Sequence, residues 1–229
     1  MVTAMESSQT PGATPPERPD PGAGLTPSGS VTPVPGYAEA ADYPVRVDVE
    51  RQETYQRWLP LVKWLLAIPH YIVLVFAGIG ALFALVYAFF ATIFTGRWPR
   101  GAFDFVLRVL QYAWRVNSYV FLMRDEYPSF ALGDDPDYPA HLSIAYPDEE
   151  IERWRPLVAW LLGIPYLIVA SLLMQLSGLM TLFAFFTILF TERYPESLFN
   201  IAVIGFRWQA RANAYVYWMV PRYPPFAWG

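Results

Sequence analysis

The polar residues best suited to chemistry form two matching sets within otherwise apolar stretches of the chain. The sets comprise Arg108, Arg115, Asn117, Arg207, Arg211 and Asn213. An arginine side chain binds a carboxylate or phosphate through paired hydrogen bonds, and an asparagine side chain both donates and accepts them. These residue types therefore suit a site for a lipid headgroup or small anion. Hydrogen bonding between helices is the plainer interpretation of the same residues.

The sequence shows no arrangement of residues typical of catalysis or metal binding. The chain has no cysteine, and its two histidines, His70 and His141, lie far apart in the sequence. Zinc and haem sites draw on cysteine and histidine ligands, so neither is expected. No Ser-His-Asp set, HExxH motif, Walker loop or dinucleotide fingerprint is present. We therefore expect no enzymatic activity, catalytic residue, metal or cofactor, and we interpret His70 as a hydrogen-bonded helix residue.

The composition indicates a membrane protein. Hydrophobic residues make up 55% and charged residues only 16% of the 229 residues. The net charge is -4, and the chain has no basic block that would neutralise phosphates. Nucleic-acid binding is therefore not expected. Without a signal peptide at the start of the chain, the first membrane helix would direct its own insertion.

Two long apolar runs are the elements that must position the polar residues. The runs extend from Trp64 to Phe94 and from Trp160 to Phe190, and neither contains Asp, Glu, Lys or Arg. Uncharged runs well beyond ~18 residues predict membrane-spanning helices. A straight helix through the first run to residue 98 would be about 51 Å long, which exceeds a bilayer of ~40–45 Å. We therefore expect a kink at Pro69 and at Pro165.

The second half of the chain repeats the first. Adding 96 to a position in the first half returns the same residue type many times without a gap. Arg57-Trp58 returns as Arg153-Trp154, and Arg115 returns as Arg211. The sequence thus predicts two tandem modules, at 43–132 and 138–228. A tight hairpin within the first apolar run, at 78–80, is disfavoured because Met174, Gln175 and Leu176 replace its glycines in the second.

Short strands are predicted where the modules begin and end. Val45, Val47 and Val49 alternate with charged residues, and Leu142 and Ile144 form a shorter match, which predicts strands at 45–49 and 142–145. Further strands at 129–132 and 225–228 would complete a small sheet or cap. Residues 1–42 are rich in Pro, Gly, Ser and Thr, which predicts a disordered tail that is either a solvated extension or a tether that binds a proline-recognising module.

The order of the motifs resembles a known family. YPVRVDVE is followed by RWLPLVKWLLAIPHYIV, FATIFTGRWP and DEYPSFAL. This order is similar to the domain-of-unknown-function family numbered 4389, which occurs as single or tandem modules in actinobacterial membrane proteins. The resemblance implies a bacterial membrane module. It implies no catalytic residues, because the family has no assigned activity.

The second helix of each module has two interpretations. Residues 101–123 are apolar but carry a polar stripe, so this helix either crosses the bilayer with the stripe inward or lies at its surface with the stripe toward water. We expect it to cross, because the ends of both modules then meet on one side. The fold class predicted is an all-α, multi-pass protein of the plasma membrane with four transmembrane helices. The distribution of Lys and Arg places both termini in the cytoplasm, with interfacial belts formed at one end by tryptophans and at the other by Trp98 and Tyr194.

Two functions follow from these features. The first is a non-enzymatic scaffold or accessory subunit whose partners are the lipid bilayer and a membrane protein or a second copy of the chain. The second is a small transporter, or a protein that binds lipids or anions, with a path lined by the arginines of the two stripes.

Overall fold

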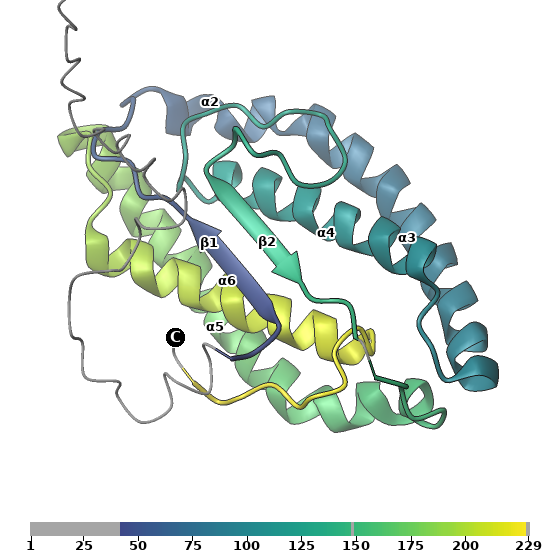
Figure 1. Ribbon diagram of the computed structural model, residues 1–229. Coiled ribbons are helices and arrows are strands. Elements are labelled where there is room, and N and C mark those ends of the chain that lie inside the picture. The colour runs from purple at the N-terminus through teal and green to yellow at the C-terminus, as the bar shows by residue number, and fades with distance from the viewer. Residues whose placement is uncertain (1–41, 148, 228–229) are drawn as a thin grey trace, which may run out of the picture. The chain divides into compact units, whose positions relative to one another are not determined.

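The computed structural model describes residues 42–147 and 149–227, which lie within one compact unit (Figure 1). Apart from Asp42, the tail predicted at 1–42 lies outside these residues. The described elements are β1 (Val45–Val49), α2 (Leu59–Leu66), α3 (Ile68–Thr95), α4 (Arg100–Val120), β2 (Ala140–Ile144), α5 (Arg155–Thr191) and α6 (Glu196–Val216). The fold is mostly helical with two tandem modules and short strands, as the sequence predicts.

Each apolar run forms one helical path. In the first module α2 ends at Leu66 and α3 begins at Ile68. The helix is therefore interrupted at Ala67, two residues before Pro69. In the second module α5 continues unbroken through Pro165. The helix is thus interrupted beside Pro69 in the first copy, whereas Pro165 lies inside one continuous helix in the second. Neither run folds back into a hairpin.

The two long helices run in opposite directions (Figure 1). The backbone N–H of Tyr55, before α2, donates to the carbonyl of Glu192 at the end of α5, at 2.9 Å. The equivalent bond joins Ile151, before α5, to the carbonyl of Gly96 at the end of α3, at 2.7 Å. Each module therefore begins where the long helix of the other ends. The expectation that the ends of both modules meet on one side is wrong, because the modules are antiparallel.

The sheet reveals the symmetry that relates the modules. β1 pairs antiparallel with β2, and Val47 lies opposite Leu142. These two residues are equivalent when the Tyr43-Pro44 and Tyr138-Pro139 steps are aligned. A pseudo-two-fold axis thus passes between Val47 and Leu142, perpendicular to the strands. The predicted strands at 45–49 and 142–145 are confirmed with a small shift in the second, whereas 129–132 and the described part of 225–228 are not strands.

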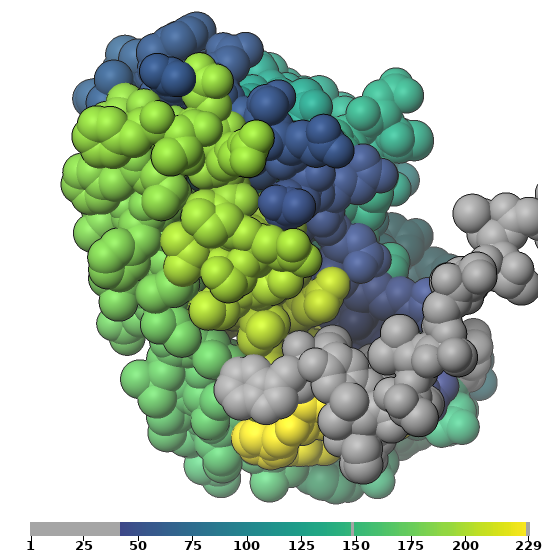
Figure 2. All heavy atoms as spheres, turned by 90° about the vertical axis from the view of Figure 1, so that its left-hand side faces the viewer, coloured from purple at the N-terminus to yellow at the C-terminus, as the bar shows by residue number. Residues whose placement is uncertain are grey.

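The elements form three layers along this axis. The sheet forms the front layer in Figure 1, with β2 packed on α4 and β1 packed on α6. Each strand thus covers the amphipathic helix of the other module. Behind α4 and α6 lie the long helices α3 and α5. Figure 2 shows this order from the side, with α5 at the left edge, α6 beside it and β1 toward the right.

The layer of long helices exposes a broad apolar surface. Large side chains such as Phe76, Phe83 and Leu172 are more than half exposed on it. Among the described residues only Leu59–Thr95 and Arg155–Thr191 are long and apolar enough to cross a membrane. Two residues of the predicted aromatic belts are not at the surface, because Trp98 and Tyr194 are each 1% exposed. These two residues belong to the core rather than to a membrane interface.

Candidate functional site

Arg115 of α4 holds the segment that follows its own helix. Its side chain is 1% exposed and donates from Nη1 to the carbonyls of Ser129 and Ala131, each at 3.2 Å, and from Nη2 to the carbonyl of Gly133. Nη1 also lies 3.6 Å from a carboxylate oxygen of Asp135. Because buried carbonyl groups need donors, one guanidinium satisfies several of them at once. Arg115 is therefore an internal attachment point for residues 129–135.

Arg211 has the equivalent place in the second module. It is 4% exposed and donates from Nη1 to the carbonyl of Ala227, at 3.3 Å. Ala227 is the counterpart of Ala131. The ring of Tyr43 lies 6.0 Å from the Arg211 guanidinium, and the ring of Tyr138 lies 5.9 Å from that of Arg115. The two arginines are thus enclosed by matching partners from both modules.

The pKa values of two ionisable neighbours of Arg115 are shifted by their surroundings. A hydrogen bond from the Ser129 hydroxyl, at 2.6 Å, lowers the pKa of Asp135, and the nearby guanidinium acts in the same direction. Burial raises the pKa of Tyr138 to about 12, so this hydroxyl stays protonated at neutral pH. The cluster therefore carries one fixed cation and one anion at neutral pH.

The other predicted arginines lie elsewhere. Arg108 is exposed, with its aliphatic stem against Gly133. Arg207 donates to the carbonyl of Val47 at 3.1 Å and pairs with Asp48 at 3.8 Å. Gln111, the counterpart of Arg207, donates in the same manner to the carbonyl of Leu142 at 3.0 Å. Arg207 and Gln111 thus satisfy carbonyls of the two strands.

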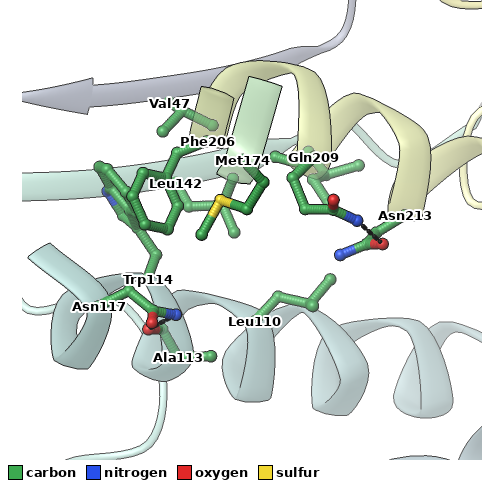
Figure 3. Close-up of a pocket in the computed structure, with 12 residues that line it drawn as sticks. Val47, Leu110, Ala113, Trp114, Asn117, Leu142, Met174, Phe206, Gln209 and Asn213 are labelled. Carbon is green, nitrogen blue, oxygen red and sulfur yellow. Dashed lines mark hydrogen bonds between the residues drawn. The ribbon is translucent and has the colours of Figure 1, made fainter. Parts of the chain in front are cut away.

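Asn117 and Asn213 line a cavity on the pseudo-two-fold axis (Figure 3). The cavity has a volume of about 130 Å³ and lies between α4, α6 and the sheet. Its walls are mostly pairs of equivalent positions from the two modules. The lining residues are Val47, Leu110, Ala113, Trp114, Asn117, Leu142, Ile144, Met174, Phe206, Gln209, Ala210 and Asn213.

The cavity suits a small neutral group. The amide of Asn117 donates to the carbonyl of Ala113 at 2.8 Å, and Gln209 donates to the Asn213 oxygen at 2.9 Å. None of the twelve described residues that line it carries a charge. Its volume is below the ~300–1,000 Å³ typical of ligand sites, and apolar cavities of about 150 Å³ accept small apolar molecules. The cavity therefore has room for a small apolar or amide-bonding group rather than for a phosphate.

His70 lies in an aromatic cluster. It is fully buried, its Nδ1 lies 2.7 Å from the Tyr112 hydroxyl, and its ring stacks on Phe130 with centroids 4.2 Å apart. Its counterpart Tyr166 stacks on Trp208 at 4.7 Å. Because an aromatic ring occupies the same place in both modules, this geometry agrees with a structural role for His70. Within the described residues no cluster suited to a metal ion is present.

One buried ion pair was not predicted from the sequence. Lys63, the only lysine in the chain, is 1% exposed. Its ammonium donates to the carbonyl of Arg124 at 2.6 Å and lies 2.8 Å from the Asp125 carboxylate. A lone lysine beside an apolar run requires a partner when it is buried, and this requirement could have predicted the ion pair from the sequence. The partner comes from the segment after α4, which the repeat did not indicate because Ala159 replaces the lysine in the second module.

These features define a class of protein: a duplicated helical hairpin, in which each amphipathic helix anchors the following segment through a buried arginine. The family model described as "Domain of unknown function (DUF4389)" matches residues 58–131 and again 154–227. The chain belongs to this family and carries its domain twice. Each match contains one hairpin and the start of the segment that follows it, but neither strand. No curated protein and no solved structure matches the chain.

Proposed function

We propose that this protein is a non-enzymatic scaffold or accessory subunit of a complex at the plasma membrane. The observation that carries the proposal is the exposed apolar layer of α3 and α5. Its two apolar runs contain no Asp, Glu, Lys or Arg over 64–94 and 160–190, and many of their large side chains are exposed. A surface of this extent is unfavourable in water and marks a contact with lipid or protein.

The opposite face gives the complex its polar contact surface. Arg46, Asp48 and Ser143 are exposed on the sheet, above the helices that the sheet covers. A molecule with an apolar layer on one side and a polar layer on the other is suited to join a membrane to a water-soluble surface. The partner on that side is a membrane-associated protein or a second copy of this chain.

A second candidate function is binding or transport of a small ligand. The axial cavity favours it, because equivalent residues of both modules converge there. An arginine-lined path receives less support, since Arg115 and Arg211 already bind internal carbonyls. Binding would therefore depend on the amides of Asn117 and Asn213. Replacing both with alanine should abolish uptake or co-purification of such a ligand, and unchanged ligand content would contradict this candidate.

The proposed membrane association does not require the predicted arrangement with four spans and cytoplasmic termini. Within the part of the chain that the structure describes, only the two long helices have the length and composition of membrane spans. For four crossings α4 and α6 would have to cross beside them, shielded from lipid by α3 and α5. Association with the membrane through the long helices does not depend on this number.

Purification from the native host tests the proposed scaffold. Membranes are washed with alkaline carbonate and then extracted with a mild detergent, and the tagged protein is analysed by mass spectrometry and light scattering. We expect the protein to remain with the membranes and to elute with a stoichiometric protein partner or as a defined oligomer. A monomer that carries a reproducible small ligand and no protein partner would favour the second candidate instead.

A further inference from the structure

We propose that α3 and α5 lie flat within one leaflet of the bilayer, with the pseudo-two-fold axis along the membrane normal and the sheet facing water. No helix crosses the membrane in this arrangement. The inference rests on the proposed membrane association and adds its geometry. It replaces the four-span arrangement with a one-sided one.

The antiparallel order of the modules is the first argument. Residues 55–57 contact Glu192, so the start of the first module lies beside the end of α5. If α3 and α5 crossed the bilayer, the two modules would begin on opposite sides. The chain would then have to return through the bilayer between α4 and α5, because β2 runs alongside the helices from one end of the molecule to the other (Figure 1).

The polar side chains on the strands argue against such a crossing. Arg46 and Asp48 are exposed on the open face of β1, and Ser143 is exposed on β2. In a spanning arrangement these groups would lie at the depth of the hydrocarbon, where charges are strongly disfavoured. The strands also form only a two-stranded, open sheet, and open sheets facing lipid do not occur in membranes. Both costs vanish when the sheet faces water.

Polar groups surround the apolar layer at both ends. Arg57 pairs with Glu192 at 2.6 Å at one end, and Arg97 pairs with Glu150 at 3.2 Å at the other. All four side chains are about half exposed or more. In the flat arrangement both pairs lie at the edge of the embedded surface, in contact with water and headgroups on the same side.

Exposed tryptophans, like the ion pairs, lie at both ends of the apolar layer. Trp58 and Trp64 lie at the start of the first long helix, and Trp154 and Trp160 lie at the start of the second. Each is at least half exposed. Because the helices are antiparallel, these rings mark opposite ends of the apolar layer. Indole rings prefer the boundary between hydrocarbon and water, which is where the edge of an embedded layer would lie.

The dimensions fit one leaflet. A helix with its side chains is ~10–12 Å across, whereas half of a ~30 Å hydrocarbon core is about 15 Å. One layer of helices therefore enters a single leaflet without reaching the other. The 28 residues of α3 extend about 42 Å along the membrane plane at ~1.5 Å per residue. A second copy stacked on the back would leave the apolar flanks of both helices in water, so lipid is the better occupant.

Single cysteines test this geometry without background, because the chain contains none. The variants are Arg57→Cys and Arg97→Cys at the two ends of the first long helix, Ser143→Cys on the sheet and Phe83→Cys on the apolar layer. All four positions are exposed, so the fold tolerates them. A membrane-impermeant maleimide is applied to right-side-out and inside-out vesicles, and after detergent. The wild-type chain is the unreactive control.

We expect the cysteines at 57, 97 and 143 to react in the same vesicle preparation and in it alone, and Phe83→Cys to react only after detergent. Reaction of Arg57→Cys and Arg97→Cys in opposite preparations would overturn the inference, because the helix then crosses the membrane. Reaction of Phe83→Cys in intact vesicles would also overturn it. Absence of the protein from the vesicles would overturn the proposed function together with it, an outcome distinct from both.

Discussion

At the scale of single residues, the repeated arginines serve the interior of the protein. The sequence identified Arg115 and Arg211 correctly as a matching pair, since both the residue type and the spacing recur. Their acceptors are backbone carbonyls, which any residue provides, so no sequence pattern indicates them. The same holds for Lys63, whose partner Asp125 is distant in the chain. Side-chain chemistry was therefore predictable, but the groups that it satisfies were not.

Removing the guanidinium of Arg115 should destabilise the fold. Arg115→Ala leaves the carbonyls of Ala131 and Gly133 without their donor, and we expect a loss of about 3 kcal/mol in the free energy of unfolding. The matched control is Arg108→Ala on the exposed face of the same helix, where we expect less than about 0.5 kcal/mol. Thermal unfolding in detergent measures both. Equal melting temperatures for the two variants would contradict the role assigned to Arg115.

Stability should fall in acid through Asp135. Its pKa is lowered in the folded protein by the Ser129 hydroxyl and Arg115, so its carboxylate favours the folded state above the unfolded pKa of 3.8. This contribution is lost as the pH falls below that value through the lower folded pKa. We expect Asp135→Asn to melt below the wild type at pH 6 and to approach it near pH 3. A difference that stays constant with pH would show that Asp135 acts through packing alone.

At the scale of elements, the apolar runs predicted the long helices, and alternation predicted the strands. Register and direction were not predictable, because they depend on contacts between the modules. The repeat itself suggested parallel copies, whereas the strand pairing requires antiparallel ones. The difference between the copies at the two prolines was not predictable either, because Pro69 follows a break between α2 and α3 whereas Pro165 lies within a continuous α5.

The close packing of α5 and α6 depends on Gly205. A Cβ at this position would lie 2.0 Å from the Ser177 hydroxyl and 2.8 Å from the Leu173 carbonyl, so Gly205→Ala should force the helices apart and destabilise the protein by about 2 kcal/mol. At Gly78 nothing lies within 4 Å, and Gly78→Ala should stabilise its helix by up to about 1 kcal/mol. Unfolding measurements on the pair test this. A neutral Gly205→Ala would refute the close approach.

At the scale of the whole molecule, an apolar layer of long helices, a middle layer of amphipathic helices and a polar sheet follow one another along the pseudo-two-fold axis. Duplication with antiparallel pairing brings both long helices to the same face. Two apolar runs that resemble separate spans thereby become one surface. The sequence indicated a membrane protein from these runs, but it contained no signal for the direction in which the second copy runs.

The most direct test of the account is whether that surface holds the protein in the membrane. Phe83 and its counterpart Leu179 are 70% and 47% exposed on it, and charges there should weaken contact with lipid without disturbing the core. The measurement is flotation of Phe83→Glu/Leu179→Glu with phospholipid vesicles, and the control is Ser143→Glu on the sheet. We predict that the double variant stays at the bottom of the gradient while the control floats like the wild type. Flotation of the double variant to the same extent as the control would contradict the account.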